Sequence, residues 1–127
     1  MFENARGAAV LAASDLARAR SFYEGVLGLQ AVEESPEEAQ MVVYELAGTR
    51  LLVYATSFAG TAKNTVFGID TDDLDRDMAA LRDKGVTFMD YDFPGLKTVD
   101  GVAELGGERS SWFADSEGNL IALSERT

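Results

Sequence analysis

The side chains able to do chemistry in this chain are acids, tyrosines and basic residues, because histidine and cysteine are both absent. The 127 residues include 22 Asp+Glu, 11 Lys+Arg and four Tyr. Without imidazole or thiolate groups the chain cannot build a Ser-His-Asp or Cys-His nucleophile, an HExxH zinc site or an iron–sulfur cluster. Any catalysis must therefore use carboxylates, Tyr, Lys or backbone amides.

The excess of acidic residues restricts the partners of the protein. The formal net charge is -11 and the pI is about 4.3, which leaves no basic surface to neutralise nucleic-acid phosphates or to attract an anionic membrane. The sequence has no apolar run of the roughly 18 residues that a membrane span requires, and Met1 to Ala12 lacks the order of a signal peptide. We therefore expect a cytoplasmic protein that binds neither nucleic acid nor membrane.

The pattern of apolar residues in the first half predicts a strand, a helix and three further strands. Ser14-Asp15 is a typical helix start, and Gly28 is placed to end that helix. Alternating apolar residues and turn signals then predict extended segments, with breaks at Ser35-Pro36-Glu37-Glu38 and at Ala47-Gly48-Thr49. The expected strands cover residues 8–13, 29–34, 40–46 and 51–56.

The second half repeats this order of elements. A helix is expected to open at Thr71-Asp72-Asp73 and to close at Lys84-Gly85, where Gly85-Val86 repeats Gly28-Leu29 57 residues further on. The expected strands cover residues 64–69, 86–91, 102–105, 108–113 and 119–125, with a loop around 92–101.

Two such halves predict one α+β domain made of tandem βαβββ modules, at about 1–56 and 64–127, joined by a small-residue linker over 57–63. A single module would leave one sheet face bare, so the modules should share a curved, mixed sheet of about eight strands with both helices on its outer face. We expect a ligand to bind in the concave face of this sheet.

Two motifs make the chain resemble the vicinal oxygen chelate superfamily, which contains glyoxalases, bleomycin resistance proteins and extradiol dioxygenases. The first runs from Ser14-Asp15-Leu16 through Ser21-Phe22-Tyr23 to Val26-Leu27-Gly28-Leu29 and is similar to the pattern DLxxAxxFYxxxLGL. The second, Trp112 to Asn119, resembles the turn F-x-D-P-D/E-G-N, with Ser116 in place of proline. Phe22 and Tyr23 are interpreted as packing residues, and Gly118 and Asp115 as turn residues.

The resemblance also indicates where metal-dependent relatives hold their ion. Their ligands lie on the first and last strands of each half, at positions that here carry Ala8, Leu52, Asn64 or Val66, and Ala122. These side chains offer no carboxylate or imidazole, and one neutral amide cannot hold a divalent ion. The strand glutamates Glu45, Glu104, Glu108 and Glu125 are expected to be solvated. We therefore expect no metal, no other cofactor, and neither glyoxalase nor dioxygenase activity.

Two-residue alternation places several small or apolar side chains on the same concave face as these positions. The expected ligand-binding residues on that face are Ala8, Val10, Leu52, Tyr54, Val66 and Ala122. Three others are added: Trp112 for ring stacking, Arg109 for an anion, and Phe93 in a segment, Phe93-Pro94-Gly95-Leu96, that either covers the site or is an ordinary turn. The alternative interpretation is that the same residues fill a hydrophobic core and do not contact a ligand.

The sequence therefore favours a metal-free, homodimeric protein that binds a small organic ligand. The acidic field would concentrate a cationic ligand, and the apolar lining suits an aromatic one. The alternative is a cofactor-free isomerase or lyase using Tyr54 or a glutamate as acid or base, with no catalytic residue assigned from sequence. A third hypothesis is an interaction domain without a ligand.

Overall fold

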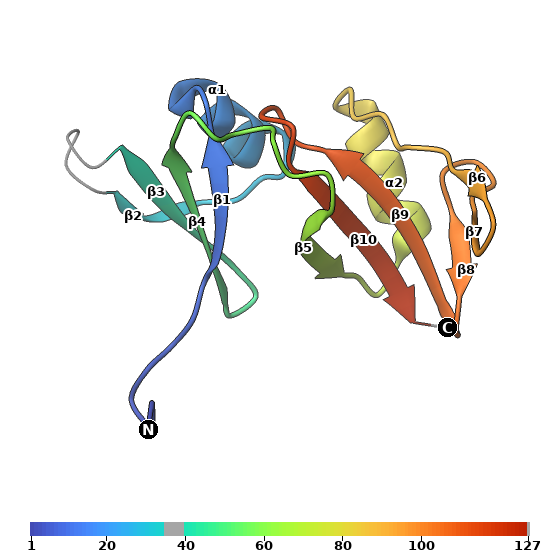
Figure 1. Cartoon of the computed structure of the whole chain (residues 1–127), viewed down its shortest axis with the longest axis horizontal. Coiled ribbons are helices and arrows are strands. Elements are labelled where there is room, and N and C mark those ends of the chain that lie inside the picture. Colours follow the sequence, from blue (N-terminus) through green and yellow to red (C-terminus); the bar gives the residue numbers. More distant parts are fainter. Residues whose placement is uncertain (35–39, 127) are drawn as a thin grey trace. The chain divides into compact units, whose positions relative to one another are not determined.

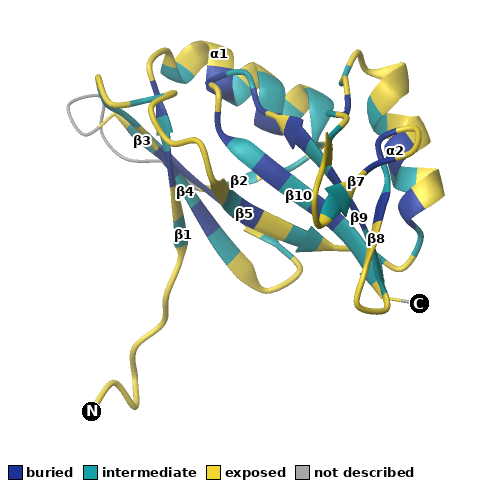
Figure 2. Cartoon of the chain, turned by 45° about the vertical axis from the view of Figure 1, so that its right-hand side comes forward, coloured by how far each residue is buried: buried dark blue, intermediate teal, exposed yellow. Residues whose placement is uncertain are grey.

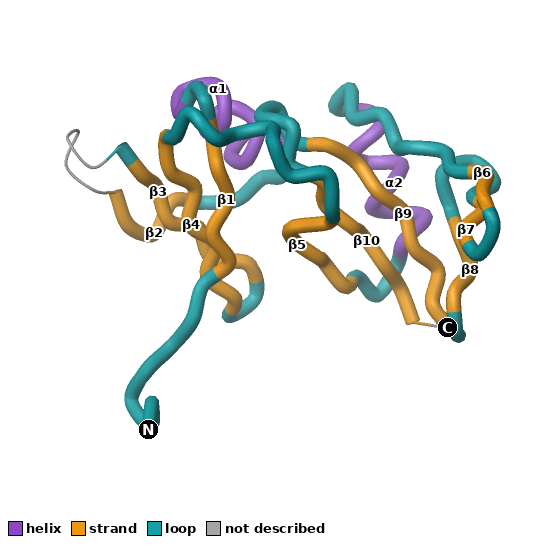
Figure 3. Tube along the Cα trace, viewed as in Figure 1, coloured by secondary structure: helices purple, strands orange, loops and turns teal. Residues whose placement is uncertain are grey.

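The computed structural model describes residues 1–34 and 40–126, so the predicted break at Ser35 to Glu38 lies outside the described residues. The chain divides into two compact units, Met1–Thr61 and Ala62–Thr127, and the boundary falls within the small-residue stretch 57–63. Each unit is a mixed sheet with a helix (Figures 1 and 3). None of the helices in the described residues is long and apolar enough to cross a membrane.

The N-terminal unit contains a four-stranded sheet in the order β1-β4-β3-β2. β1 pairs with β4 in parallel, whereas β3 pairs with β4 and with β2 in antiparallel fashion. A tight turn joins β3 to β4, with Ala47 and Gly48 both at positive φ, as a two-residue hairpin loop requires. The strands are β1 (Ala9–Ala13), β2 (Ala31–Glu34), β3 (Met41–Leu46) and β4 (Thr49–Ala55).

The helical segment of this unit is less regular than the single helix predicted. α1 (Leu16–Arg20) begins where expected, because the Asp15 carboxylate accepts a hydrogen bond from the Arg18 amide at 3.0 Å. The chain then widens into a π-helix, η1 (Ser21–Val26), whose last bond runs from the Leu27 amide to the Phe22 carbonyl. Gly28, at φ +72°, ends it at the predicted position.

The C-terminal unit repeats the strand order of the first. Its sheet has the order β5-β10-β9-β8, again with one parallel pair, β5 with β10, and two antiparallel pairs. The eight strands thus form two four-stranded mixed sheets rather than the single sheet of about eight strands expected, while the α+β class and the βαβββ order are as predicted. These strands are β5 (Thr65–Asp70), β8 (Ala103–Leu105), β9 (Glu108–Ala114) and β10 (Leu120–Arg126).

The connection from helix to β8 differs from the prediction. α2 (Leu74–Asp83) starts at the Asp73 cap and packs against β10. The strand expected over 86–91 is reduced to a single bridge between Phe88 and Phe113. Within the expected loop, β6 (Asp92–Phe93) and β7 (Leu96–Lys97) form a small hairpin closed by Pro94-Gly95, so this segment is a tight turn.

Burial alternates along the strands and separates two faces of each sheet (Figure 2). The face on the side of α1 and η1 carries Leu11, Leu51 and Val53, and Tyr23 of η1 is also buried. The face on the side of α2 carries Phe113, Ile121 and Leu123, and Met78 of α2 is also buried. We call the opposite side of each sheet its distal face. In the N-terminal sheet the distal face carries Val10, Leu52 and Tyr54; in the C-terminal sheet it carries Gly68, Trp112 and Ala122.

Candidate functional site

A row of two small residues and one large residue crosses the distal face of the C-terminal sheet. Ala122 on β10 pairs with Gly68 on β5 and with Trp112 on β9, so Ala122 lies directly between the other two positions. A Cβ atom added at Gly68 would meet nothing within 4 Å. The row therefore leaves space over Gly68 and Ala122 beside the half-buried indole of Trp112.

Two further aromatic rings extend this surface from Trp112. The ring of Tyr91 lies edge-on to Trp112, with 5.7 Å between centroids, and edge-on to Phe93, with 5.8 Å between centroids. Phe93 is 53% exposed, and the Tyr91 hydroxyl donates to the Met89 sulfur at 3.1 Å. Edge-to-face pairs of this kind hold aromatic rings in fixed orientations.

Hydrogen bonds hold the segment that carries Tyr91 and Phe93. The Thr98 hydroxyl accepts from the Tyr91 amide at 2.8 Å and donates to the Asp90 carboxylate at 2.8 Å. The same Asp90 oxygen accepts from the Gly101 amide at 2.9 Å. On the sheet side, the Met89 amide donates to the Trp112 carbonyl. The aromatic rings therefore project from a chain fixed at both ends of the hairpin.

The N-terminal sheet presents aliphatic residues and one phenol on its distal face. Val10 is the direct partner of Leu52, and Ala12 is the partner of Tyr54. Val10 is 57% exposed and Tyr54 39%. Ala8 precedes β1 and is exposed. Alternation along β1 and β4 thus brings Val10, Leu52 and Tyr54 to one face of one sheet.

The remaining predicted residues do not all lie with these groups. Val66 lies at the register shift between Thr65 and Phe67 in β5. Arg109 lies on the side of α2, opposite to Trp112, where its guanidinium donates to Asp75 at 2.9 Å and to Glu125 at 3.3 Å.

Sequence reasoning did not name Gly68 or Tyr91. A glycine inside a strand is a recognised signal for close approach of another group, and it would have identified Gly68. The two-residue spacing of Tyr91 and Phe93 is a weaker signal for Tyr91, because the hairpin that orients it was not predicted.

The titratable groups with displaced pKa values lie away from both distal faces. A hydrogen bond from Arg20 holds the pKa of Glu24 below its usual range, although partial burial opposes this effect. The pKa of Asp75 is likewise lowered by its hydrogen bonds from Arg109. Carboxylates held ionised in this way act as structural partners rather than as proton donors at neutral pH.

Comparison with known proteins identifies the family. The model of the Glyoxalase/Bleomycin resistance protein/Dioxygenase superfamily matches residues 6–123. The chain belongs to this superfamily. The superfamily assignment accounts for the two motifs and the repeated βαβββ order, and no curated protein gives a significant match to the chain.

Solved structures show the same superfamily fold in proteins of different names. An integron cassette protein from the mobile metagenome of V. cholerae is 28% identical, with 93% of this chain and 91% of that chain covered and a TM-score of 0.63. Lactoylglutathione lyase from Agrobacterium tumefaciens is 19% identical, with 98% and 96% covered and a TM-score of 0.71. The fosfomycin resistance protein FosX from Listeria monocytogenes is 15% identical, with 100% and 94% covered and a TM-score of 0.74.

The positions that the resemblance assigns to the metal ligands of related proteins do not offer a set of metal donors here. Ala8, Leu52, Val66 and Ala122 carry no donor atom in their side chains, and Asn64 directs its amide nitrogen to the Thr65 carbonyl at 3.2 Å. Divalent ions need several oxygen, nitrogen or sulfur ligands. Within residues 1–34 and 40–126, no group of three or more acidic side chains is placed to supply them.

Proposed function

We propose that this protein is a metal-free, small-molecule binding member of the superfamily and that it holds a planar aromatic ligand on the distal face of the C-terminal sheet. The observation that carries the proposal is the row Gly68–Ala122–Trp112, with open space over Gly68 at one end and an indole ring at the other. A flat ring can lie on the two small residues and contact Trp112 at their side.

The dimensions and charge of this surface narrow the ligand class. Neighbouring strands are about 4.8 Å apart, so the row from Gly68 to Trp112 spans about 10 Å, the length of a fused-ring system. The hydroxyls of Ser110 and Ser124 share a hydrogen bond of 2.8 Å beside this row and offer a polar contact. The net charge of -11 favours a cationic ligand over an anionic one.

The single tryptophan provides a direct measurement of binding. We expect a planar aromatic cation such as an acridine, or bleomycin, to quench the fluorescence of Trp112 in a saturable way, with calorimetry giving the same dissociation constant. The expected reason is contact between the ligand ring and the indole ring.

A glycine-to-valine pair of variants tests the location. Gly68→Val fills the space over β5, and we expect it to weaken binding at least tenfold without lowering the free energy of unfolding, because a β-branched residue suits a strand. Gly7→Val is the matched control, since Gly7 also has open space around it but lies in the other unit. Equal affinities for both variants and the unaltered protein, or no binding to either compound, would contradict the proposal.

A further inference from the structure

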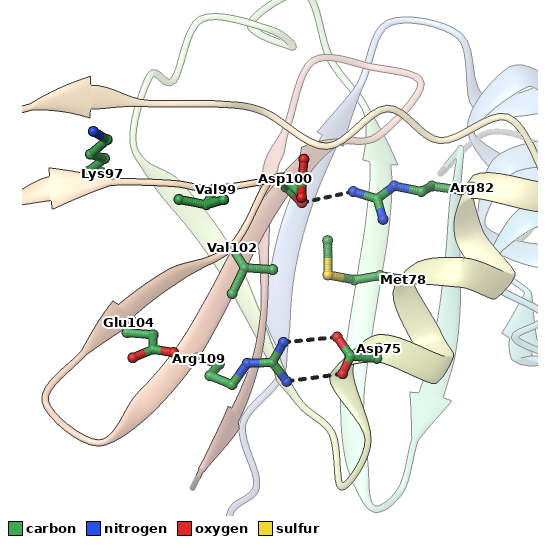
Figure 4. Close-up of a pocket in the computed structure, with 9 residues that line it drawn as sticks. All are labelled: Asp75, Met78, Arg82, Lys97, Val99, Asp100, Val102, Glu104 and Arg109. Atoms are coloured by element: carbon green, nitrogen blue, oxygen red, sulfur yellow. Dashed lines mark hydrogen bonds and ion pairs between the residues drawn. The ribbon is translucent and has the colours of Figure 1, made fainter.

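A second pocket lies on the opposite side of the C-terminal sheet from the proposed ligand face. Its volume is about 640 Å³, within the usual range for small-ligand sites. It is formed by α2, β8, β9 and the segment that follows β7 (Figure 4). The pocket is therefore separate from the Gly68–Ala122–Trp112 row, although both belong to the same unit.

The floor of this pocket is apolar. Met78 from α2 is buried, Val102 is half-buried, and Val99 is 68% exposed at the rim. Figure 4 shows Val102 and Met78 between two charged groups, the Arg82–Asp100 contact and the Arg109–Asp75 ion pair. A ligand in this pocket would thus place its apolar part on Met78 and Val102.

An exposed guanidinium with free donors lies at one end of the floor. Arg82 donates one hydrogen bond to the backbone carbonyl of Asp100 at 3.0 Å, and its guanidinium lies over the Phe88 ring, 5.2 Å from the centroid. In the described part of the chain no carboxylate pairs with it. The backbone of Asp100 has φ +52°, in the left-handed region that Asp adopts more readily than most residues other than glycine. Arg82 is therefore oriented by the fold while most of its N–H groups remain available.

The charge at the other end is an unpaired carboxylate. Arg109 is already neutralised, because Asp75 accepts two hydrogen bonds from it, at 2.9 and 3.4 Å, and Glu125 accepts a third. Glu104, the cross-strand partner of Arg109, is exposed and makes no ion pair within residues 1–34 and 40–126. The exposed Lys97 and the carboxylate of Asp100 add one charge of each sign to the rim.

We propose that this pocket binds a small zwitterion, an aminocarboxylate whose two charged ends are separated by an apolar chain. Its carboxylate would accept hydrogen bonds from Arg82 at one end, its ammonium group would pair with Glu104 at the other, and the apolar chain between them would pack on Met78 and Val102. A zwitterion is favoured over a simple anion because a protein of charge -11 repels anions. It is favoured over a simple cation because only a carboxylate satisfies the free donors of Arg82.

Ligand-observed NMR on the full chain tests this site with 6-aminohexanoate, 7-aminoheptanoate and 8-aminooctanoate, amino acids whose two charges lie at the ends of an apolar chain. We expect at least one to bind, and we expect its N-acetyl derivative and its amide to bind at least tenfold more weakly, because each lacks one of the two charges. Binding of the N-acetyl derivative or the amide as tight as that of the free amino acid would overturn the zwitterion assignment, and absence of binding by all three amino acids would overturn the site.

Variants then locate the binding. Arg82→Gln and Glu104→Gln should each weaken binding at least tenfold, whereas Arg6→Gln and Glu3→Gln, matched changes in the other unit, should not. Val99→Trp keeps every charge but fills the rim, so it should also abolish binding. Because Val99 is exposed, we expect this variant to fold normally, and thermal unfolding checks this. Unchanged affinity in these three pocket variants would place the amino acid elsewhere and refute the proposal.

Discussion

Asp115 organises the turn between β9 and β10 through one buried carboxylate. One of its oxygens accepts hydrogen bonds from the amides of Glu117 and Asn119, both at 2.8 Å, and the other accepts from the Asn119 side chain at 2.7 Å. The residue is only 7% exposed. This explains why an aspartate begins the Asp115-Ser116-Glu117-Gly118-Asn119 motif: it satisfies three donors that would otherwise be buried without partners.

Asp115→Ala should lower the free energy of unfolding by about 3 kcal/mol, because three buried donors lose their acceptor. Asp115→Asn should cost less, since it keeps one acceptor oxygen. Urea unfolding measures both. The free energy of unfolding of the matched variant Asp92→Ala, at an exposed position of β6, should stay within about 0.5 kcal/mol of that of the unaltered protein. If Asp115→Ala changes it no more than this control does, the turn does not depend on Asp115.

Glu24 is the polar partner of a fully buried tyrosine. Its carboxylate accepts a hydrogen bond from the Tyr44 hydroxyl at 2.8 Å and forms an ion pair with Arg20 at 2.7 Å. Burial and the neighbouring carboxylate raise the pKa of Tyr44, while the Arg20 hydrogen bond lowers the pKa of Glu24. The pair thus joins η1 to β3 with the carboxylate ionised and the phenol neutral.

Glu24→Gln should reduce both stability and its dependence on pH. Because the pKa of Glu24 is lower when folded, its contribution is complete above the ordinary value of 4.5 and is lost as the pH falls below it. We expect a loss of about 1 kcal/mol at pH 7 and a shallower decline in acid. Unfolding curves from pH 7 to acid would show this. Glu45→Gln, an exposed change on the same sheet, should stay within about 0.5 kcal/mol of the unaltered protein at pH 7. An unchanged pH profile for Glu24→Gln contradicts the assignment.

At the scale of elements, the signals with a local cause were predicted correctly. Asp15 and Asp73 mark the starts of α1 and α2 because each carboxylate accepts a hydrogen bond from the amide three residues later. Gly28 and Gly48 adopt positive φ where the sequence indicated a helix end and a turn. Such features depend on a few neighbouring residues, so they can be predicted from the sequence.

The elements that were mispredicted depend on distant contacts. The π-helix η1 accompanies the burial of Tyr23, which stacks on Tyr44 21 positions further along the chain. The strand expected over 86–91 is interrupted because only Phe88 bridges to β9, and the chain then turns into the β6–β7 hairpin. Neither outcome can be predicted from the local pattern of apolar residues.

The segment after this hairpin depends on a glycine in close contact with its surroundings. Gly101 has φ +82°, and an added Cβ would lie 3.1 Å from the Phe88 Cβ and 3.4 Å from atoms of Arg82 and Met78. Gly95, in the hairpin itself, has φ +85° but open space around it. The two glycines therefore share a backbone conformation and differ in packing.

Gly101→Ala should lower the free energy of unfolding by about 2–3 kcal/mol, through backbone strain and the contact with Phe88. Gly95→Ala should cost only about 1 kcal/mol, because it meets the strain alone. Chemical denaturation of both variants gives the difference. Equal losses of unfolding free energy in the two variants would mean that the segment moves away freely and that the close packing around Gly101 does not contribute to stability.

At the scale of the whole molecule, the repeated βαβββ order was predictable, and part of the site with it. Period-two alternation selected Ala122, and Trp112 was added separately for ring stacking; the structure pairs the two residues directly. Alternation did not reveal Gly68, whose importance comes from the β5–β10 register, nor the opposite orientation of Arg109. Register between strands far apart in sequence is set by the packed sheet, so no local pattern encodes it.

We predict that two copies of the chain associate, as the resemblance to the superfamily implies. Light scattering should give twice the chain mass of 13.7 kDa. Because each copy carries a charge of -11, association should strengthen as salt is raised to about 0.15 M, where charges are screened beyond about 8 Å. A single-chain mass at all concentrations and salt levels would contradict this prediction.

The matching strand orders of the two sheets have a consequence for how the chain opens. β4 and β10 are each hydrogen-bonded to a neighbour on both sides, one parallel and one antiparallel, whereas β1, β2, β5 and β8 lie at the sheet edges. Amide protons in the middle of a sheet exchange with deuterium only after their neighbours have separated. The slowest exchange should therefore centre on β4 and β10, whose middle residues Leu52 and Leu123 are 71 positions apart. A deuteration time course would then display the internal duplication of this protein as two peaks of protection.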